Sequence, residues 1–350
     1  MKPPAVTQGK ILPEDQAWFE NCHASSLLKL GEGRFLCAYM AGTREGAPDM
    51  AIWLSRCENG LWLPPRRIHY TYLLPHWNPV LFQDGSAVHL YYKRGHTVHD
   101  WYTMHSVSQD GGVTWSEPAE AIEGNHRPRI CVRCKIIQDS QGNWIGPASV
   151  ESAAHWDSFV DISRDSGKTW TKHPIPFRHE APPLPAPRPE SLWEGLAAGA
   201  LWEGRLDTLM RWDGIIQPTA WESEPGHLHV LMRSTRGFLY RSDSTDAGMT
   251  WCEAYPTSLP NNNSGIDVAR TNSGILALAY NPVGQNWGKR TPLSLSFSDN
   301  NGETWTQPLA LESQPGEYSY PAVIADGESL CFSYTHNRRN IVFGSCCFQA

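Results

Sequence analysis

The sequence predicts an all-β fold, a six-bladed β-propeller, and three observations support this prediction. A motif of the form S-x-D/N-x-G-x-T-W occurs four times, ending at Trp115, Trp170, Trp251 and Trp305. Short runs rich in β-branched and aromatic residues lie between the copies. The chain of 350 residues also contains 27 Pro and 29 Gly, which is typical of many short strands joined by turns.

Each copy of the motif has the composition of a hairpin turn. In the first copy, Ser108 and Asp110 can bond nearby backbone amides, Gly112 can adopt a positive φ angle, and Trp115 can pack between neighbouring sheets. The motif is therefore predicted to be structural rather than catalytic. A degenerate relative, Ser55–Trp62, has one residue fewer between its Gly and its Trp and marks a fifth unit.

The spacing of these units gives the blade count. The intervals between motif Trp residues are regular except for a wide one between Trp170 and Trp251, which holds a Pro-rich insertion at about 173–209. Within it, 190–209 could carry a short helix. A last unit, 320–342, lacks the motif but contains a strand pattern. We therefore expect six blades in a single domain over residues 1–350, with the two termini sharing the closing blade.

Composition limits the possible partners and compartment. The net charge of −7 and pI of about 6.0 give no electrostatic reason to bind nucleic acid or an anionic membrane. The N-terminal residues lack a secretory signal pattern and no stretch is apolar enough to span a bilayer. Nine scattered cysteines fit reduced core thiols. A cytoplasmic protein is the expectation, and the sequence does not indicate an oligomeric state.

Motifs for cofactor or metal chemistry are absent from the sequence. It contains no Walker loop, no H-E-x-x-H and no G-x-G-x-x-G after a strand pattern. Cys131 and Cys134 form a lone C-x-x-C without a second pair at zinc-finger spacing. We therefore expect neither a cofactor nor a bound metal.

The repeated motif resembles the Asp box, and a string of Asp boxes on a propeller of this length is similar to the sialidase (neuraminidase) superfamily. The resemblance covers nearly the whole chain. In that family three arginines hold the substrate carboxylate, an Asp is the general acid, and a Tyr activated by a Glu is the nucleophile. The resemblance thus implies an exo-glycosidase that cleaves a terminal sialic- or uronic-acid-type sugar from an acidic oligosaccharide or glycoconjugate.

Two arginines match the family's substrate-binding triad. Arg290, in K-R-T-P-L-S-L-S-F-S, stands like the third arginine, and Arg233, in L-M-R-S-T-R-G, stands like the second. A guanidinium stays charged and bonds both oxygens of a carboxylate, so a pair of them suits an acidic sugar. Surface salt bridges are the alternative role for both, and Arg236 competes with Arg233 for the position.

The loop G-T-R-E-G-A-P-D-M contains Arg44 and Asp49 and resembles the first-blade loop that delivers the family's acid. An Asp shielded from water there could carry a raised pKa and protonate a leaving oxygen. Alternatively, Asp49 caps the turn before the strand that begins at Ala51. Glu45 is the second candidate for the acid.

The segment G-E-Y-S-Y-P-A-V-I resembles the tyrosine motif of the family's final blade. A phenol can attack the anomeric carbon of an anionic sugar with less charge repulsion than a carboxylate, so Tyr318 is the candidate nucleophile. In a regular strand Tyr320 would share its face and could reach the substrate instead. Either tyrosine could also pack against the neighbouring blade.

The chain departs from the family at two positions. The first triad arginine is missing, and His23 stands in its place in N-C-H-A-S-S. Gln217, in I-I-Q-P-T, stands where the Tyr-activating Glu is expected, and Gln cannot accept a proton. Glu317 or Glu151 could substitute for that Glu.

These departures also fit a second activity. Some related propellers are lyases that cleave a rhamnose–glucuronate linkage, and the first-blade His and the G-T-x-E-G loop look similar to theirs. In β-elimination an Arg neutralises the carboxylate while a His or Tyr moves the proton. His23, His76 and Tyr318 would then act.

Further residues could enlarge the binding site. Arg129, with Arg127, is predicted to start the inner strand of the third blade and to widen the basic floor, and Trp77 could stack on a sugar ring. A third possibility, a glycan-binding propeller without activity, stays open as well.

Overall fold

The computed structural model describes residues 4–152, 155–180 and 212–347. The described residues form 25 strands and contain no helix, as the sequence predicts. Most of the Pro-rich insertion, including the helix considered for 190–209, lies outside the described residues.

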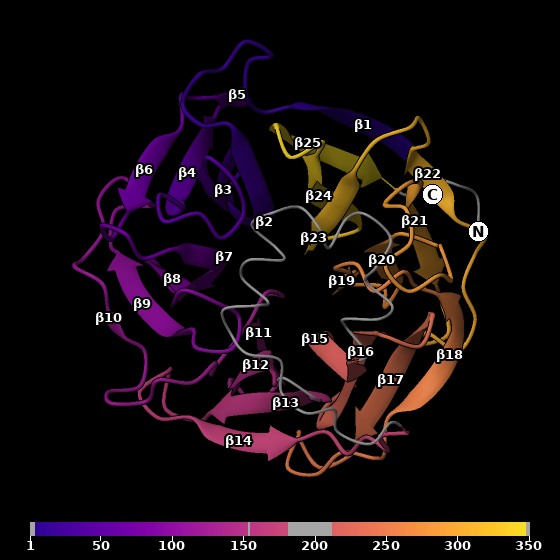
Figure 1. The fold of residues 1–350 in the computed structure, drawn as a ribbon. Helices are drawn as coiled ribbons and strands as arrows, with labels where there is room; N and C mark the ends of the chain where they lie inside the picture. Colours follow the sequence, from indigo (N-terminus) through magenta and orange to yellow (C-terminus); the bar gives the residue numbers. More distant parts are fainter. Residues whose placement is uncertain (1–3, 153–154, 181–211, 348–350) are drawn as a thin grey trace.

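The strands form antiparallel sheets arranged in a ring (Figure 1). The first three blades follow one another in chain order. Blade 1 contains β2 (Asn21–Gly31), β3 (Arg34–Gly42), β4 (Ala51–Glu58), β5 (Leu61–Trp62) and β6 (Arg66–His69). Blade 2 contains β7 (His76–Asp84), β8 (Ala87–Arg94), β9 (Tyr102–Ser108) and β10 (Ala119–Glu120). Blade 3 contains β11 (Ile137–Gln138), β12 (Trp144–Glu151), β13 (His155–Ser163) and β14 (Thr171–Pro174).

The second half of the ring repeats this order. Blade 4 contains β15 (Asp213–Glu224), β16 (His227–Ser234), β17 (Phe238–Ser244) and β18 (Tyr255–Pro260). Blade 5 contains β19 (Asp267–Arg270), β20 (Leu276–Tyr280), β21 (Leu293–Ser298) and β22 (Leu309–Glu312). Blade 6 contains β23 (Tyr318–Asp326), β24 (Ser329–His336), β25 (Asn340–Cys347) and the N-terminal β1 (Ala5–Lys10).

The first and last strands close the ring. β1 pairs antiparallel with β25 along its whole length, from Ala5 opposite Cys347 to Lys10 opposite Val342. The prediction that the termini share one blade is therefore confirmed. Blades 3 and 4 are also linked directly, because His155 and Trp156 pair in parallel with Asp213 and Gly214.

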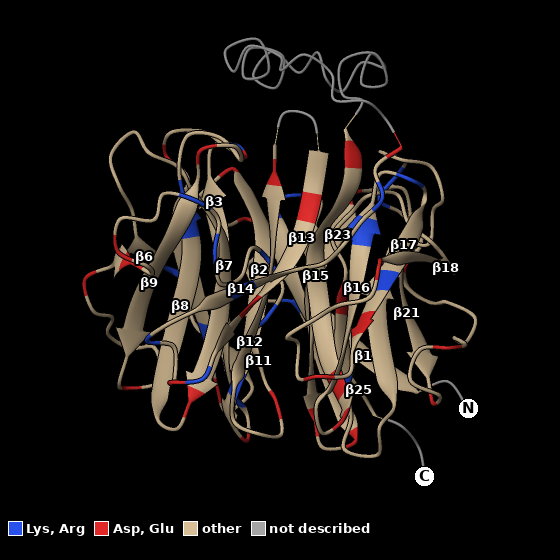
Figure 2. Ribbon diagram, turned by 90° about the horizontal axis from the view of Figure 1, so that it is seen from below, with Lys and Arg blue, Asp and Glu red and all other residues tan. Residues whose placement is uncertain are grey.

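The two ends of the ring have different roles, and we call them upper and lower as they appear in Figure 2. Asn21 pairs with Gly42, which comes just before the loop 43–50, and Ile52, just after that loop, pairs with His69 at the end of blade 1. The loop 43–50 and the connections from one blade to the next therefore lie at the same end, the upper one. The lower end holds the motif turns. Most Asp and Glu residues lie in loops at the two ends (Figure 2).

The motif turns have the structure that the sequence predicts. The Ser108 hydroxyl accepts a hydrogen bond from the Gly112 amide (2.7 Å), and the Asp110 carboxylate accepts one from the Thr114 amide (2.9 Å). Gly112 has φ of 84°, and a Cβ there would lie 2.8 Å from the Leu36 side chain. The other three copies repeat the Ser and Asp or Asn bonds.

The innermost part of every blade contains one non-glycine residue with positive φ. These six residues have φ between 42° and 70°: Ala24, Asn78, Ile130, Gln217, Asn263 and Tyr320. In β2, β7, β15 and β23 the residue coincides with a shift in pairing register. An extra, unpaired residue bends a strand and changes which side chains face the axis. We call these six positions the inner kinks.

Apolar side chains fill the space between neighbouring blades. One buried cluster joins Leu36, Met40 and Ile52 of blade 1 to Leu81 and Tyr92 of blade 2. All nine cysteines are free thiols. Within the described ranges, no helix is long and apolar enough to span a membrane, and no three His, Cys, Asp or Glu side chains are placed to hold a metal ion.

A buried carboxylate, Asp267, ties four blades together. Its Oδ1 accepts hydrogen bonds from the Thr219 hydroxyl (2.7 Å) and the Lys135 ammonium (2.9 Å), and its Oδ2 accepts one from the Val323 amide (2.8 Å). The residue is 1% exposed. Blades 3, 4, 5 and 6 therefore meet at one anion.

Replacing Asp267 by Asn should destabilise the protein. An amide has one acceptor oxygen instead of two, so some of the buried donors that surround Asp267 lose their partner. We expect the free energy of unfolding, measured by urea denaturation, to fall by about 3 kcal/mol. Asp299→Asn, at an exposed position of blade 5, should change it by less than about 0.5 kcal/mol. Equal effects of the two variants would contradict the role assigned to Asp267.

Candidate active site at the ring axis

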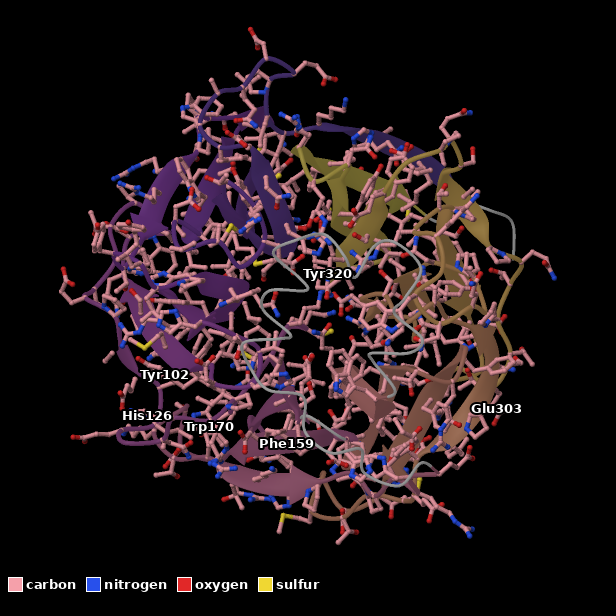
Figure 3. The ribbon with its side chains drawn as sticks, in the orientation of Figure 1. Tyr102, His126, Phe159, Trp170, Glu303 and Tyr320 are labelled. Atoms are coloured by element: carbon pink, nitrogen blue, oxygen red, sulfur yellow. The ribbon has the colours of Figure 1, made fainter. Side chains whose placement is uncertain are left out.

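The phenol of Tyr320 lies at the centre of the ring (Figure 3). Three guanidinium carbons surround its ring centroid, at 5.2 Å for Arg133, 5.5 Å for Arg290 and 5.8 Å for Arg233. Its hydroxyl lies 3.1 Å from Nη1 of Arg233, and its ring packs 4.1 Å from the ring of His23. Blades 1, 3, 4, 5 and 6 thus contribute to one cluster.

Tyr318 occupies a different environment. It is 3% exposed, belongs to the apolar cluster of blades 5 and 6, and packs edge-on against His336 at 5.1 Å. A shared face with Tyr320 is expected for a regular strand, but the inner kink at Tyr320 shifts the register between Ser319 and Ala322. The kink therefore sends one tyrosine to the axis and the other into the core.

Arg233 hydrogen-bonds only neutral groups among the described residues. Its Nε donates to Oδ1 of Asn263 (2.9 Å), its Nη1 to Oε1 of Gln217 (3.1 Å), and its Nη2 to the carbonyl of Asn263. Gln217 thus occupies the expected place of the family's Glu and contacts the second-arginine candidate. It orients this guanidinium without neutralising its charge.

Arg133 was not among the residues predicted from sequence. Its Nη1 donates to the carbonyl of Ile266 (2.9 Å), its Nη2 donates to the carbonyl of Pro321, and its Nε is buried without a hydrogen-bond partner. The sequence pattern placed a regular inner strand here, whereas residues 129–136 form no strand. Arg133 adds a second guanidinium with no carboxylate bonded to it.

Arg290 belongs to an ion-pair chain across blades 5, 6 and 1. Oε1 of Glu317 accepts hydrogen bonds from Arg290 Nη1 (2.7 Å) and Arg338 Nε (2.6 Å), and Arg338 also pairs with Glu45. Burial opposes ionisation of Glu317, but Arg338 and Arg290 outweigh it and lower its pKa. Glu317 is therefore a fixed anion that positions two guanidinium groups.

His23 is enclosed behind Tyr320. It is fully buried, its Nδ1 lies 3.0 Å from the Thr335 hydroxyl, and its Nε2 has no hydrogen-bond partner. Burial, followed by the nearby charges of Arg338 and Arg290, holds the pKa of His23 well below its ordinary value. The imidazole is thus neutral at physiological pH and packs against the phenol.

Glu151, the last residue of β12, is the carboxyl suited to carrying a proton near neutral pH. Burial raises its pKa to about 7, Arg233 opposes this shift, and Glu45 adds to it. A general base is most effective when its pKa lies near the working pH, because much of it is then in the basic form and it still binds a proton well.

The remaining candidates in the first-blade loop lie at its exposed surface. Oδ2 of Asp49 accepts hydrogen bonds from the Thr43 amide (2.9 Å) and hydroxyl (2.6 Å), so Asp49 closes the loop 43–50 at the upper end. Arg44 is exposed in the same loop. Glu45, in the same loop, forms an ion pair with Arg338 and is thereby connected to Glu317 and Arg290.

His76, Trp77 and Arg129 have hydrogen-bond partners outside the Tyr320 cluster. Nε2 of His76 lies 2.9 Å from the Thr71 hydroxyl, and burial lowers its pKa to about 3. Trp77 is 6% exposed and donates to the Gly95 carbonyl (2.8 Å). Arg129 binds both oxygens of Asp161 at 2.8 Å. The structure does not bring these three side chains into the Tyr320 cluster.

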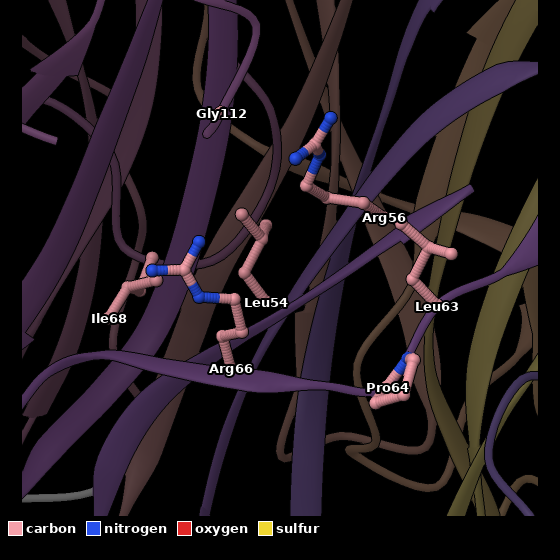
Figure 4. Close-up of a pocket in the computed structure, with 7 residues that line it drawn as sticks. All are labelled: Leu54, Arg56, Leu63, Pro64, Arg66, Ile68 and Gly112. Carbon is pink, nitrogen blue, oxygen red and sulfur yellow. The ribbon is translucent and has the colours of Figure 1, made fainter. Parts of the chain in front are cut away.

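A small pocket lies elsewhere, between the outer part of blade 1 and the motif turn of blade 2 (Figure 4). Its lining is mainly apolar, and none of the sequence-predicted site residues lines it: Leu54, Arg56, Leu63, Pro64, Arg66, Ile68 and Gly112.

A family described as "BNR repeat-like domain" matches residues 33–332 of the chain. No curated protein matches.

Solved structures share the fold at low sequence identity. "Hadza microbial sialidase Hz136" matches with a TM-score of 0.70 and 16% identity, over 94% of this chain and 66% of that one. A protein of unknown function from Dyadobacter fermentans matches with a TM-score of 0.68 and 14% identity, over 94% of this chain and 95% of that one. Trypanosoma rangeli sialidase matches with a TM-score of 0.68 and 11% identity, over 98% of this chain and 60% of that one. The chain thus spans less than two thirds of these two sialidases.

Proposed function

The chain belongs to the BNR repeat-like family, and we propose that it is a glycoside hydrolase that removes a terminal acidic sugar of the sialic- or uronic-acid type. The observation that supports this most is the Tyr320 phenol at the ring axis, hydrogen-bonded to Arg233 and surrounded by three guanidinium groups. A nucleophile and a carboxylate-binding group are thereby combined in one place.

The charge of the cluster favours an anionic ligand. Burying an ionised group is costly unless an opposite charge accompanies it, and within the described residues the hydrogen bonds of Arg133 and Arg233 go to uncharged partners. A substrate carboxylate would supply the missing negative charge. Arg290, which Glu317 holds in place, would bind the same carboxylate or the neighbouring hydroxyls.

The proposed reaction uses Tyr320 as the nucleophile. Its oxygen attacks the anomeric carbon and the bond to the leaving oxygen breaks. Glu151, whose pKa responds to the charge of Arg233 in the same cluster, is the proposed final acceptor of the phenolic proton. The surrounding guanidiniums favour the developing phenolate. Asp49, which is exposed on the loop at the upper end and lacks the shielding expected from the sequence, is the proposed proton donor to the leaving oxygen. Water then attacks the anomeric carbon and the bond to Tyr320 breaks. One proton of the water passes to Asp49, and Glu151 returns its proton to the Tyr320 oxygen.

Elimination is supported less well by the geometry. It uses a histidine or tyrosine to take the C5 proton and another to protonate the leaving oxygen, but His76 packs against Tyr92 at 4.8 Å and His23 is fully buried, so Tyr320 alone of these candidates is placed at the arginine cluster. A propeller that binds glycans without cleaving them would also use the arginine cluster, so a direct assay must separate the three possibilities.

We expect hydrolysis in an assay with a sialoside panel and uronate-terminated oligosaccharides. The product should be a free acidic sugar with one added water, detected by mass spectrometry, without the ultraviolet absorbance of an unsaturated uronate. An unsaturated product would establish elimination. Binding of a panel member without turnover would establish a recognition protein.

Tyr320→Phe should lower kcat/KM by roughly a thousandfold or more, because the attacking oxygen is removed while the ring packing stays. Tyr318→Phe is the matched control, since that ring lies in the core, and it should stay within about threefold of the wild-type protein. The opposite ranking of the two variants would assign the reaction to Tyr318.

Glu151→Gln should remove the pH dependence near neutrality. If Glu151 takes the phenolic proton, kcat/KM of the wild-type protein rises with pH as the carboxyl ionises around its pKa of about 7. The variant should lack this rise and be about a hundredfold slower at pH 8. Glu224→Gln, exposed at the lower end, is the control. A rise that persists in Glu151→Gln would rule out this role.

A further inference from the structure

Three side chains at the lower end of blade 4 form a hydrogen-bonded series. The Ser223 hydroxyl oxygen lies 2.7 Å from Nε2 of His229, and Nδ1 of His229 lies 2.5 Å from Oδ1 of Asp243. Ser223 comes from β15, His229 from β16 and Asp243 from β17. Neighbouring strands of one sheet thus bring together a serine, a histidine and an aspartate.

The partners of this series fix its protonation. Two groups face Nδ1 of His229, the Asp243 carboxylate at 2.5 Å and the donor Nη2 of Arg241 at 3.0 Å. The shorter contact assigns the Nδ1 proton to the bond with Asp243, and Nε2 is then the acceptor for the Ser223 hydroxyl. Asp243 also accepts from the Tyr255 hydroxyl (2.6 Å) and from Arg241 Nε (2.8 Å). The imidazole is therefore in the tautomer that can take a proton from serine.

Asn301, from the motif turn of blade 5, supplies an amide donor beside Nε2 of His229. Its Oδ1 accepts from the Trp221 indole (2.8 Å), which leaves Nδ2 directed toward Nε2 of His229 at 3.1 Å. Its backbone carbonyl accepts from Arg241 (2.7 Å). Trp221 also stacks on His229, with ring centroids 5.2 Å apart. The amide is thus held in one orientation.

The backbone presents Ser223 at the surface. The pairing of β15 with β16 shifts register between Glu222 and Glu224, so Ser223 is the extra residue of a β-bulge. Bulges redirect side chains and are frequent beside active sites. Ser223 is half-buried, whereas His229 beneath it is 7% exposed. The serine is accessible and its base is shielded from water.

We propose that Ser223, His229, Asp243 and Asn301 form a second catalytic centre, an esterase that hydrolyses short acyl esters. A nucleophile bonded to a base, a base held by a carboxylate, and a nearby amide donor are the components of acyl transfer. The centre lies at the opposite end of the ring from the Tyr320 cluster and does not depend on the function proposed there.

The reaction proceeds in two balanced steps. The Ser223 oxygen attacks the ester carbonyl as its proton moves to Nε2 of His229, and the Asn301 amide binds the carbonyl oxygen as it becomes negative. The ester C–O bond breaks, and the alcohol leaves with that proton. Water then attacks the acyl-serine, gives a proton to Nε2, and releases the carboxylic acid as Ser223 recovers its hydrogen.

A fluorophosphonate probe tests the proposal on the intact protein. Ser223 should displace fluoride and form a covalent adduct, which peptide mass spectrometry would locate. The wild-type protein should also hydrolyse 4-nitrophenyl acetate. Ser223→Ala should reduce both to background, and Asp243→Asn should lower kcat/KM for the ester by about a hundredfold or more.

Ser140→Ala is the matched control, because Ser140 is an exposed serine bonded to the adjacent Glu222 (2.9 Å). It should keep both labelling and hydrolysis. The adduct on wild-type protein needs no variant, so a folding defect in Ser223→Ala cannot hide the result. Absence of an adduct on Ser223, or labelling at an unchanged rate in Asp243→Asn, would overturn the proposal.

Discussion

The inner kinks are the constraint on which the candidate site depends. A regular strand alternates its side chains between two faces, which would direct both tyrosines of β23 to the same face. A single residue with positive φ breaks this alternation and sends Tyr320 to the axis while Tyr318 stays in the core. Gln217 and Asn263, at two further kinks, contact Arg233. The same backbone feature thus places three of the central side chains.

The arginines at the axis form two groups that differ in their hydrogen-bond partners. Arg290 and Arg338 share Glu317, so their guanidiniums are held by an anion of the protein itself. Arg133 and Arg233 are held by carbonyl and amide oxygens, which fix their geometry without bonding them to a carboxylate of the described residues. A site built in this way is preorganised for an anion, because the guanidiniums need not leave a competing carboxylate before binding.

Local features of the sequence predicted most of the fold and part of the site. The motif turns, the blade strands and the shared closing blade depend on nearby residues or on a regular repeat, and they appear as predicted. The resemblance pointed to Arg233, Arg290 and Tyr318, whereas Tyr320 was considered only because a regular strand would place it on the same face as Tyr318, and the kink removes that premise. Arg133 was missed because residues 129–136 depart from the strand pattern. The contact of Tyr320 with His23 and the pairing of Glu317 with Arg338 depend on long-range packing, which no local pattern encodes.

The closure of the ring determines that blade 6 is completed after the other blades. The hydroxyls of Thr7 and Ser345 meet across 338 positions, and bringing distant segments together costs chain entropy that nearer contacts do not. During synthesis, the hairpins of blades 1 to 5 can form as they emerge, but β1 must wait for β25. A ribosome-bound chain therefore carries an unpaired edge until β25 has been synthesised, and this is the stage at which a chaperone would be most useful.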